Sequence, residues 1–219
     1  MRIQKNNMSL TEKNLREKNF HNELQSRPKG RFENIFYKAL ANIWDDFYNH
    51  LKKKSKNAEV LDYGCGIGPS IIEVSNYQPK KIIGIDISEI SIKKAKDKTK
   101  NLGSMVELKV DNCEKTSFEN NQFDLVYGQG ILHHLEFSRC LEEILRILKP
   151  GGSLLFIEPL GTNPMINLYR KLTPKSRSID EHPFTSKDFL LLKNKYKEVE
   201  IKYYGFLTLV FFPFYLDPN

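Results

Sequence analysis

Cysteine is scarce in this sequence of 219 residues, which has only Cys65, Cys113 and Cys140. Three cysteines cannot all pair within one chain, and these three are not spaced as in a zinc site. The sequence therefore predicts neither a disulfide framework nor a metal centre. Residues 1–10 are polar and lack the apolar core of a signal peptide. We accordingly expect a reduced protein in the cytoplasm.

Long apolar runs are missing as well. The most apolar segment, residues 206–216, has eleven residues, whereas a helix that spans a membrane needs about 20. We expect a final β-strand there, because aromatic residues favour strands, with Pro213 at an edge or beyond the strand. Peripheral contact with a membrane, or with a partner, is the alternative. A further strand is expected over residues 199–203.

Positive charge is not spread evenly along the chain. The formal net charge is +7, and residues 1–57 contain all of the excess, with 13 basic residues against 6 acidic ones. Such an arm can bind nucleic acid or anionic lipid. Its densest part, residues 52–56, equally fits an exposed helix end, and aromatic residues do not alternate with the basic ones as on a surface that binds single strands. We favour the helix end and expect no nucleic-acid partner.

The most informative motif is Val60-Leu61-Asp62-Tyr63-Gly64-Cys65-Gly66-Ile67-Gly68. An apolar strand leads through Asp62 into a loop of alternating glycines, which permit sharp bends and close approach of a ligand. A helix that begins near Pro69 would direct its backbone N–H groups at that ligand. The dinucleotide pattern G-x-G-x-x-G needs a glycine where this chain has Pro69, so the motif argues against a pyrophosphate.

Two further strands end at an aspartate. The apolar run Lys81–Asp86 ends 24 residues after Asp62, near the offset of about 20 at which such folds place a ribose-binding carboxylate. A third run, Met105–Val110, is followed by Asp111. One aspartate alone could simply shape a turn. Three at successive strand ends favour a ligand site, because open α/β sheets bind ligands at the carboxyl ends of their strands.

With two later segments, these motifs resemble the class I S-adenosylmethionine-dependent methyltransferases, in particular small-molecule enzymes of the ubiquinone-biosynthesis-like group. Residues 123–135 are similar to the family's fourth motif, and residues 145–158 to its helix, Pro-Gly-Gly turn and fifth strand. The resemblance implies S-adenosylmethionine as cofactor, with Asp62 at its cationic amino-acid portion, Asp86 at the ribose and Asp111 at the adenine. The implied cofactor-binding residues are Asp62, Gly64, Cys65, Gly66, Gly68, Asp86, Ile87, Asp111, Asn112, Gln129 and His134.

The order of elements predicts an α/β fold. Helices are followed by β-α-β-α-β-β-α-β, which is typical of a doubly wound sheet. The resemblance implies a Rossmann-like, mostly parallel, seven-stranded sheet with helices on both faces. We expect a basic helical extension or lid over residues 1–57 and a methyltransferase domain over 58–219, with an acceptor-pocket insertion at about 160–185. Helical spacing of apolar residues predicts an amphipathic helix over Glu33–Leu51. Of the residues in the extension, Phe20, His21, Phe36 and Tyr37 could touch the cofactor or the acceptor.

In-line attack on a methyl sulfonium depends mainly on positioning the acceptor. A base is needed only if the acceptor loses a proton, and His133 or His134 could serve. Helix capping or packing beside the cofactor is the alternative that we favour for these histidines. We expect a small-molecule acceptor that is methylated on oxygen or nitrogen. The candidate acceptor-binding residues are Tyr37, Glu158, Arg170 and His182.

Two other functions are compatible with parts of the sequence. The basic arm would suit an RNA- or protein-directed methyltransferase, but the chain lacks the Asn/Asp-Pro-Pro-aromatic motif of enzymes that modify exocyclic amines. Gly128-Gln129-Gly130 occupies that strand end instead. A noncatalytic cofactor-binding scaffold is the second alternative, against which the intact carboxylates argue. Nothing in the sequence points to a particular oligomeric state.

Overall fold

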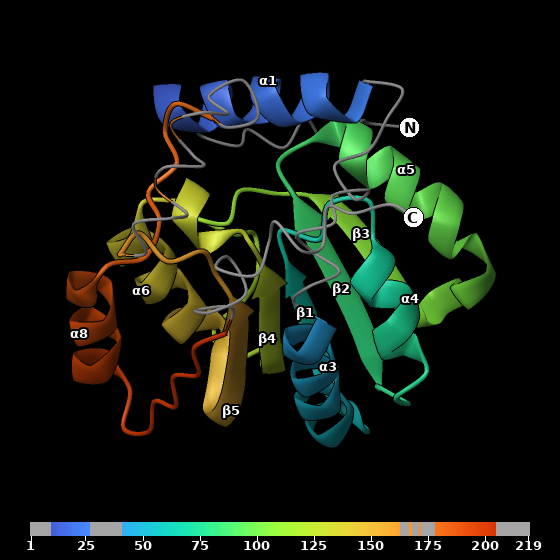
Figure 1. Ribbon diagram of the computed structural model, residues 1–219. Coiled ribbons are helices and arrows are strands. Elements are labelled where there is room, and N and C mark those ends of the chain that lie inside the picture. The colour runs from blue at the N-terminus through green and yellow to red at the C-terminus, as the bar shows by residue number, and fades with distance from the viewer. Residues whose placement is uncertain (1–9, 27–40, 163–166, 168–170, 172–177, 205–219) are drawn as a thin grey trace, which may run out of the picture.

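A twisted parallel sheet forms the centre of the protein (Figure 1). The computed structural model describes residues 10–26, 41–162, 167, 171 and 178–204. Within them the strand order is β3-β2-β1-β4-β5, and all four neighbouring pairs are parallel. The order therefore reverses between β1 and β4, where doubly wound sheets bind ligands. The strands are β1 (Glu59–Tyr63), β2 (Lys81–Asp86), β3 (Val106–Val110), β4 (Phe123–Gln129) and β5 (Leu148–Ile157).

Helices cover both faces of the sheet, as predicted. One apolar cluster joins one face to α3, α4 and α5, and a second joins the other face to α6 and α8. Both clusters are built from strand side chains that are almost fully buried, which explains why the strands read as continuous apolar runs. These helices are α3 (Ala41–Ser55), α4 (Pro69–Ser75), α5 (Glu89–Thr99), α6 (Phe137–Ile147) and α8 (Ser186–Lys195).

Local sequence sets the helix ends that matter for the site. Ser88 caps α5, and its side-chain oxygen accepts a hydrogen bond from the Ser91 backbone N–H at 3.0 Å. The short 3-10 helix η2 (Lys100–Met105) follows α5 and leads into β3. Thr185 and Asp188 form a capping box at the start of α8. The three consecutive lysines 52–54 lie in the exposed last turn of α3, where cations complement the helix dipole.

The Pro-Gly-Gly segment differs from the prediction. We expected a turn before a strand that starts after Gly152, whereas β5 begins at Leu148, directly after α6. The register with β4 jumps from Phe123 opposite Leu148 to Leu125 opposite Ser153. The extra residues form a bulge in β5, in which Gly151 has φ 78°.

A helix that the sequence did not clearly indicate, α1 (Glu12–Ser26), crosses the edge of the sheet at which the strands end (Figure 1). Two hydrogen bonds of 2.8 and 2.9 Å join Arg16 to Asp180, and Lys18 pairs with Glu89 at the start of α5. The predicted helix over 33–51 appears as α3, while residues 27–40 lie outside the described part of the chain. The N-terminal extension thus contributes both α1, above the strand ends, and α3, against one face.

The strand expected over residues 199–203 is the clearest error of the sequence interpretation. The described residues form five strands, not seven, and the strand expected over 199–203 is absent there. Lys202 and Tyr204 instead contact Asp46 on α3, with Lys202 Nζ 2.9 Å from the carboxylate. The strand predicted over 206–216 lies outside the described residues. None of the helices described is both long and apolar enough to cross a bilayer.

Candidate functional site

A cleft of about 420 Å³ lies between α1 and the carboxyl ends of the strands. The sheet side supplies the glycine loop after β1, the end of β2, the segment after β3 and the loop after β4. The other side is α1. Of the predicted site residues, those that line the cleft are His21, Gly64, Gly66, Asp86, Ile87, Asn112, Gln129 and His134.

The glycine loop presents bare backbone to this cleft. Gly66 has φ 53°, and an added Cβ would point into open space, so the peptide itself forms the wall. Gly64 has φ 78°, and a Cβ there would lie 2.5 Å from the Ile131 side chain. Gly68, also at positive φ, packs against Ala95 of α5 and does not line the cleft. The first two glycines thus shape the wall, and the third brings α4 close to α5.

Asp86 links the loop to β2. One carboxylate oxygen accepts the Gly66 N–H at 2.9 Å, and the other accepts the Ser88 N–H at 2.8 Å. Burial raises the pKa of Asp86, and these hydrogen bonds oppose the rise. Because a carboxylate has about four acceptor sites, Asp86 can still accept hydrogen bonds from a ligand in the cleft.

Asp111 and Asn112, which follow β3, have different roles. The Asp111 carboxylate accepts hydrogen bonds from the Asn112 N–H and from both the N–H and the hydroxyl of Ser117, so it holds its own turn together. Asn112 lines the cleft and donates its side-chain amide to Asn14 Oδ1 of α1 at 3.2 Å. The predicted contact of Asp111 with adenine stays a prediction, while Asn112 and Cys113 of this turn line the cleft.

Asp62 lies beneath the loop rather than in the cleft wall. Its Oδ2 accepts hydrogen bonds from Ser70 Oγ at 2.7 Å and from the Tyr127 hydroxyl at 3.0 Å. Burial, only partly opposed by these bonds, raises the pKa of Asp62 to about 7. Cys65 is buried in the apolar cluster below, where burial raises the pKa of its thiol. Both residues therefore support the loop from the side opposite the cleft.

The loop after β4 is fixed by Glu158 at the end of β5. Its carboxylate accepts the backbone N–H groups of Ile131, Leu132 and His133 at 3.0, 2.8 and 3.3 Å. His133 Nδ1 lies 2.7 Å from the same carboxylate, and burial lowers the pKa of this histidine. Neither His133 nor Glu158 lines the cleft. Glu158 therefore orders the short 3-10 helix η3 (Leu132–His134).

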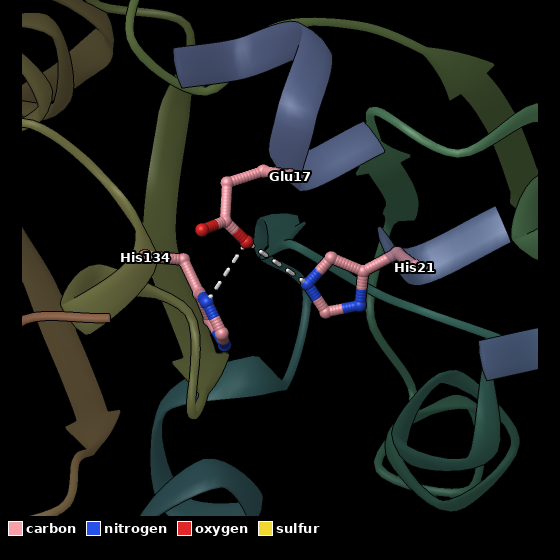
Figure 2. A group of neighbouring side chains, drawn as sticks. All are labelled: Glu17, His21 and His134. Carbon is pink, nitrogen blue, oxygen red and sulfur yellow. Dashed lines mark ion pairs between the residues drawn. The ribbon is translucent and has the colours of Figure 1, made fainter. Parts of the chain in front are cut away.

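His134 points into the cleft, where it meets α1. Figure 2 shows Glu17 between His134 and His21, with its carboxylate directed at both rings. Glu17 Oε2 lies 3.1 Å from His134 Nδ1 and 3.7 Å from His21 Nε2. Burial opposes ionisation of Glu17, but contacts with His134 and Ser178 outweigh it and lower the pKa of the carboxyl. The cleft therefore contains an ionised carboxylate beside two imidazoles.

The remaining acceptor-side predictions do not converge on this cleft. His182 belongs to a separate hollow, has a side chain that is 62% exposed, and lies 3.6 Å from Asp188. Its backbone N–H donates to the His133 carbonyl oxygen at 2.6 Å. Tyr37 and Arg170 lie outside the described residues.

Sequence reasoning missed Asn14 and Glu17. Both are polar, yet their exposed fractions are only 3% and 5%. Thr11 and Asn14 exchange hydrogen bonds between side chain and backbone at 3.1 and 3.2 Å, which resembles a capping box. That Thr-x-x-Asn spacing could have located the start of α1, but only the tertiary structure shows that the helix covers the cleft.

A protein-family model described as a methyltransferase domain matches residues 61–156. The match includes the glycine loop, Asp86, Asp111 and His134. The segment therefore matches a methyltransferase domain, which agrees with the resemblance found in the sequence. The matched residues, 61–156, run from β1 to β5 and so include all five strands of the sheet described above.

Similar proteins agree with this assignment. A sterol 4-C-methyltransferase of Caenorhabditis elegans is 30% identical over 120 residues, which cover 52% of this chain and 36% of that protein. Phosphoethanolamine N-methyltransferase 3 of Arabidopsis thaliana is 27% identical over 192 residues, or 82% of this chain and 38% of that protein. The chain thus spans well under half of both relatives. A methyltransferase structure from Bacillus halodurans C-125 shares the fold, with a TM-score of 0.57, 24% identity, and coverage of 68% of this chain and 65% of that one.

The cofactor predicted from the sequence, S-adenosylmethionine, agrees with the match to a methyltransferase domain. The cleft fits it, because Gly66 leaves open space against bare backbone and Asp86 has acceptor sites to spare. The Asp86 carboxylate would accept hydrogen bonds from the ribose hydroxyls, and the Asn112 side-chain amide would donate a hydrogen bond to the adenine base.

Proposed function

We propose that this protein transfers a methyl group from S-adenosylmethionine to oxygen or nitrogen of a small-molecule acceptor. The observation that carries the proposal is that one cleft contains both Gly66 and Asp86, suited to the cofactor, and His134 beside Glu17, suited to an acceptor. The small-molecule relatives support this acceptor class.

The chain's part in the reaction is mainly to position the reactants. When bound, the cofactor supplies a methyl group that is already activated by its sulfonium. Holding an acceptor in line can contribute up to about 7 to 11 kcal/mol. Helix α1 lines one side of the cleft. Glu17 and His134 are 5% and 4% exposed, so both side chains are shielded from solvent.

Cofactor binding is tested first, by calorimetry with S-adenosylhomocysteine. Asp86→Ala should weaken binding at least about tenfold, because a hydrogen bond to a charged group contributes about 1.5 to 3 kcal/mol. Asp97→Ala, which changes an exposed aspartate on α5, is the matched control and should bind normally. Folded wild-type protein that shows no saturable binding would overturn the proposal.

Transfer is tested next, with radiolabelled methyl donor and a panel of acceptors. The panel should include amino-alcohol phosphates, sterols and other hydroxyl or amine compounds, because the relatives include enzymes named for phosphoethanolamine and for sterols. Label that is transferred only to RNA or to protein would contradict the proposed acceptor class.

We also propose a cytoplasmic location. It is supported by the three cysteines, all buried and unpaired, which suit a reducing compartment.

A further inference from the structure

Glu17, His21 and His134 bring one carboxylate and two imidazoles to a single point of the cleft (Figure 2). Glu17 and His21 are one helical turn apart on α1, and His134 belongs to η3, more than a hundred residues later in the chain. One donor atom from each residue lies within 4.8 Å of the others. Helix α1 and the loop after β4 therefore meet through three potential metal ligands.

The contact between Glu17 and His134 is not satisfied as a simple hydrogen bond. Glu17 Oε2 and His134 Nδ1 are 3.1 Å apart, yet both are fully buried atoms that find no partner with hydrogen-bond geometry among the described residues. Buried polar atoms are normally paired, because desolvation without a partner is costly. Two such atoms facing the same space indicate that a third species completes the site.

We propose that Glu17, His21 and His134 bind a divalent first-row metal ion, with Zn²⁺ as the best match. Two histidines and one glutamate are a known ligand set of catalytic zinc sites. With metal–ligand bonds of about 2.0 to 2.2 Å in a tetrahedral arrangement, neighbouring ligand atoms lie about 3.3 to 3.5 Å apart. The separations of Glu17 Oε2 from His134 Nδ1 and from His21 Nε2, 3.1 and 3.7 Å, lie on either side of that range. The third separation, between the ligand atoms of His21 and His134, is at most 4.8 Å, so a bound ion would draw the two imidazoles together.

A second grouping, His133, His134 and Glu181, shares His134 and competes for it. His133 and Glu181 do not line the cleft, and His133 Nδ1 already contacts Glu158. All three residues of the first grouping line the cleft and include both unsatisfied atoms. The first grouping is therefore the assigned site.

The consequence concerns the acceptor, and it rests on the proposed function. Three protein ligands leave one zinc position for a water or a substrate atom, and here that position opens into the cofactor cleft. A hydroxyl or amine that coordinates the ion would be oriented and have its pKa lowered. The site thus selects acceptors with a metal-coordinating oxygen or nitrogen, and the ion joins α1 to η3.

Metal binding is measured by titrating Zn²⁺ into chelator-treated full-length protein, with Co²⁺ absorption reporting four-coordinate geometry. We expect one ion per chain. Glu17→Gln and His21→Ala should each weaken binding at least about tenfold, since even residues behind the ligands contribute 10- to 100-fold. Asp46→Asn and His50→Ala are matched controls, because Asp46 and His50 form another i,i+4 acid–histidine pair on α3. Both should bind like wild type.

Several outcomes would overturn the site. The wild-type protein could fail to bind Zn²⁺ stoichiometrically, or folded Glu17→Gln could bind Zn²⁺ as tightly as wild type does. The third such outcome is that Glu181→Gln loses Zn²⁺ binding while Glu17→Gln retains it. Circular dichroism of each variant checks folding, and His21→Ala, which changes a partly exposed side chain, covers the case in which Glu17→Gln fails to fold. Binding of S-adenosylhomocysteine, measured on the same metal-free and metal-loaded samples, separates the two proposals. Nucleoside binding without metal binding overturns only the metal site, and no nucleoside binding overturns the proposed function.

Discussion

Asp62→Asn should remove a pH dependence of stability that one buried carboxyl creates. In the folded protein, burial outweighs the hydrogen bonds from Ser70 and Tyr127 and raises the pKa of Asp62 from 3.8 to about 7. An asparagine has nearly the same shape, and its side-chain oxygen can accept the same two hydroxyl protons.

The sign follows from the protons bound in each state. Below about pH 4 the Asp62 carboxyl is neutral in both the folded and the unfolded chain. As the pH rises towards 7, the unfolded chain releases this proton while the folded protein keeps it, so stability falls. Between pH 5 and pH 8 the loss is about 2 to 3 kcal/mol, and the asparagine variant does not incur it.

Urea unfolding at pH 5, 6, 7 and 8, followed by circular dichroism, provides the measurement. Asp97→Asn, at an exposed position of α5, is the control. As the pH rises, the free energy of unfolding of Asp62→Asn should increase relative to those of the wild-type protein and Asp97→Asn. Parallel profiles for all three proteins would refute the assignment of a buried, largely protonated Asp62.

Three further outcomes are expected. Glu158→Gln should destabilise the protein by about 1.5 to 3 kcal/mol in thermal or urea unfolding, because it weakens charged hydrogen bonds to η3; an unchanged midpoint would contradict that role. Gly64→Ala should fold poorly or fail to bind S-adenosylhomocysteine, since its Cβ would meet Ile131 at 2.5 Å and its φ is positive; normal binding by calorimetry would count against the loop geometry. Arg16→Ala should leave global stability nearly unchanged, as exposed ion pairs contribute little, yet speed limited proteolysis within α1; equal cleavage rates would show that this pair does not hold the helix.

The sheet and its ligand edge were predictable because their signals are local. The apolar run from Ile82 to Ile85 lies between Lys81 and Asp86, and β2 has the bounds Lys81–Asp86. Serine is also a preferred residue at helix starts, and Ser88 caps α5. Strand order at the centre follows from right-handed crossovers, which bring the ends of β1, β2 and β4 together.

The direction of individual side chains was not predictable in the same way. Asp62 and Asp86 read alike in the sequence, at the ends of successive strands, but only Asp86 lines the cleft. Strand alternation and the path of the glycine loop turn Asp62 towards Ser70 and Tyr127. Likewise, α1 is polar along its length, so hydrophobic periodicity could not indicate that Asn14 and Glu17 would be buried over the site.

The attachments of α1 have a consequence for exchange of molecules with solvent. Near its middle the helix is joined to the rest of the protein by Arg16 with Asp180 and by Lys18 with Glu89, both partly exposed charge pairs. The sheet beneath depends on apolar packing, which salt does not weaken. Raising the ionic strength should therefore weaken these two pairs but not the buried hydrogen bond between Asn14 and Asn112, so α1 should loosen near its middle while the sheet stays intact. Cofactor should then enter and leave faster without unfolding of the domain.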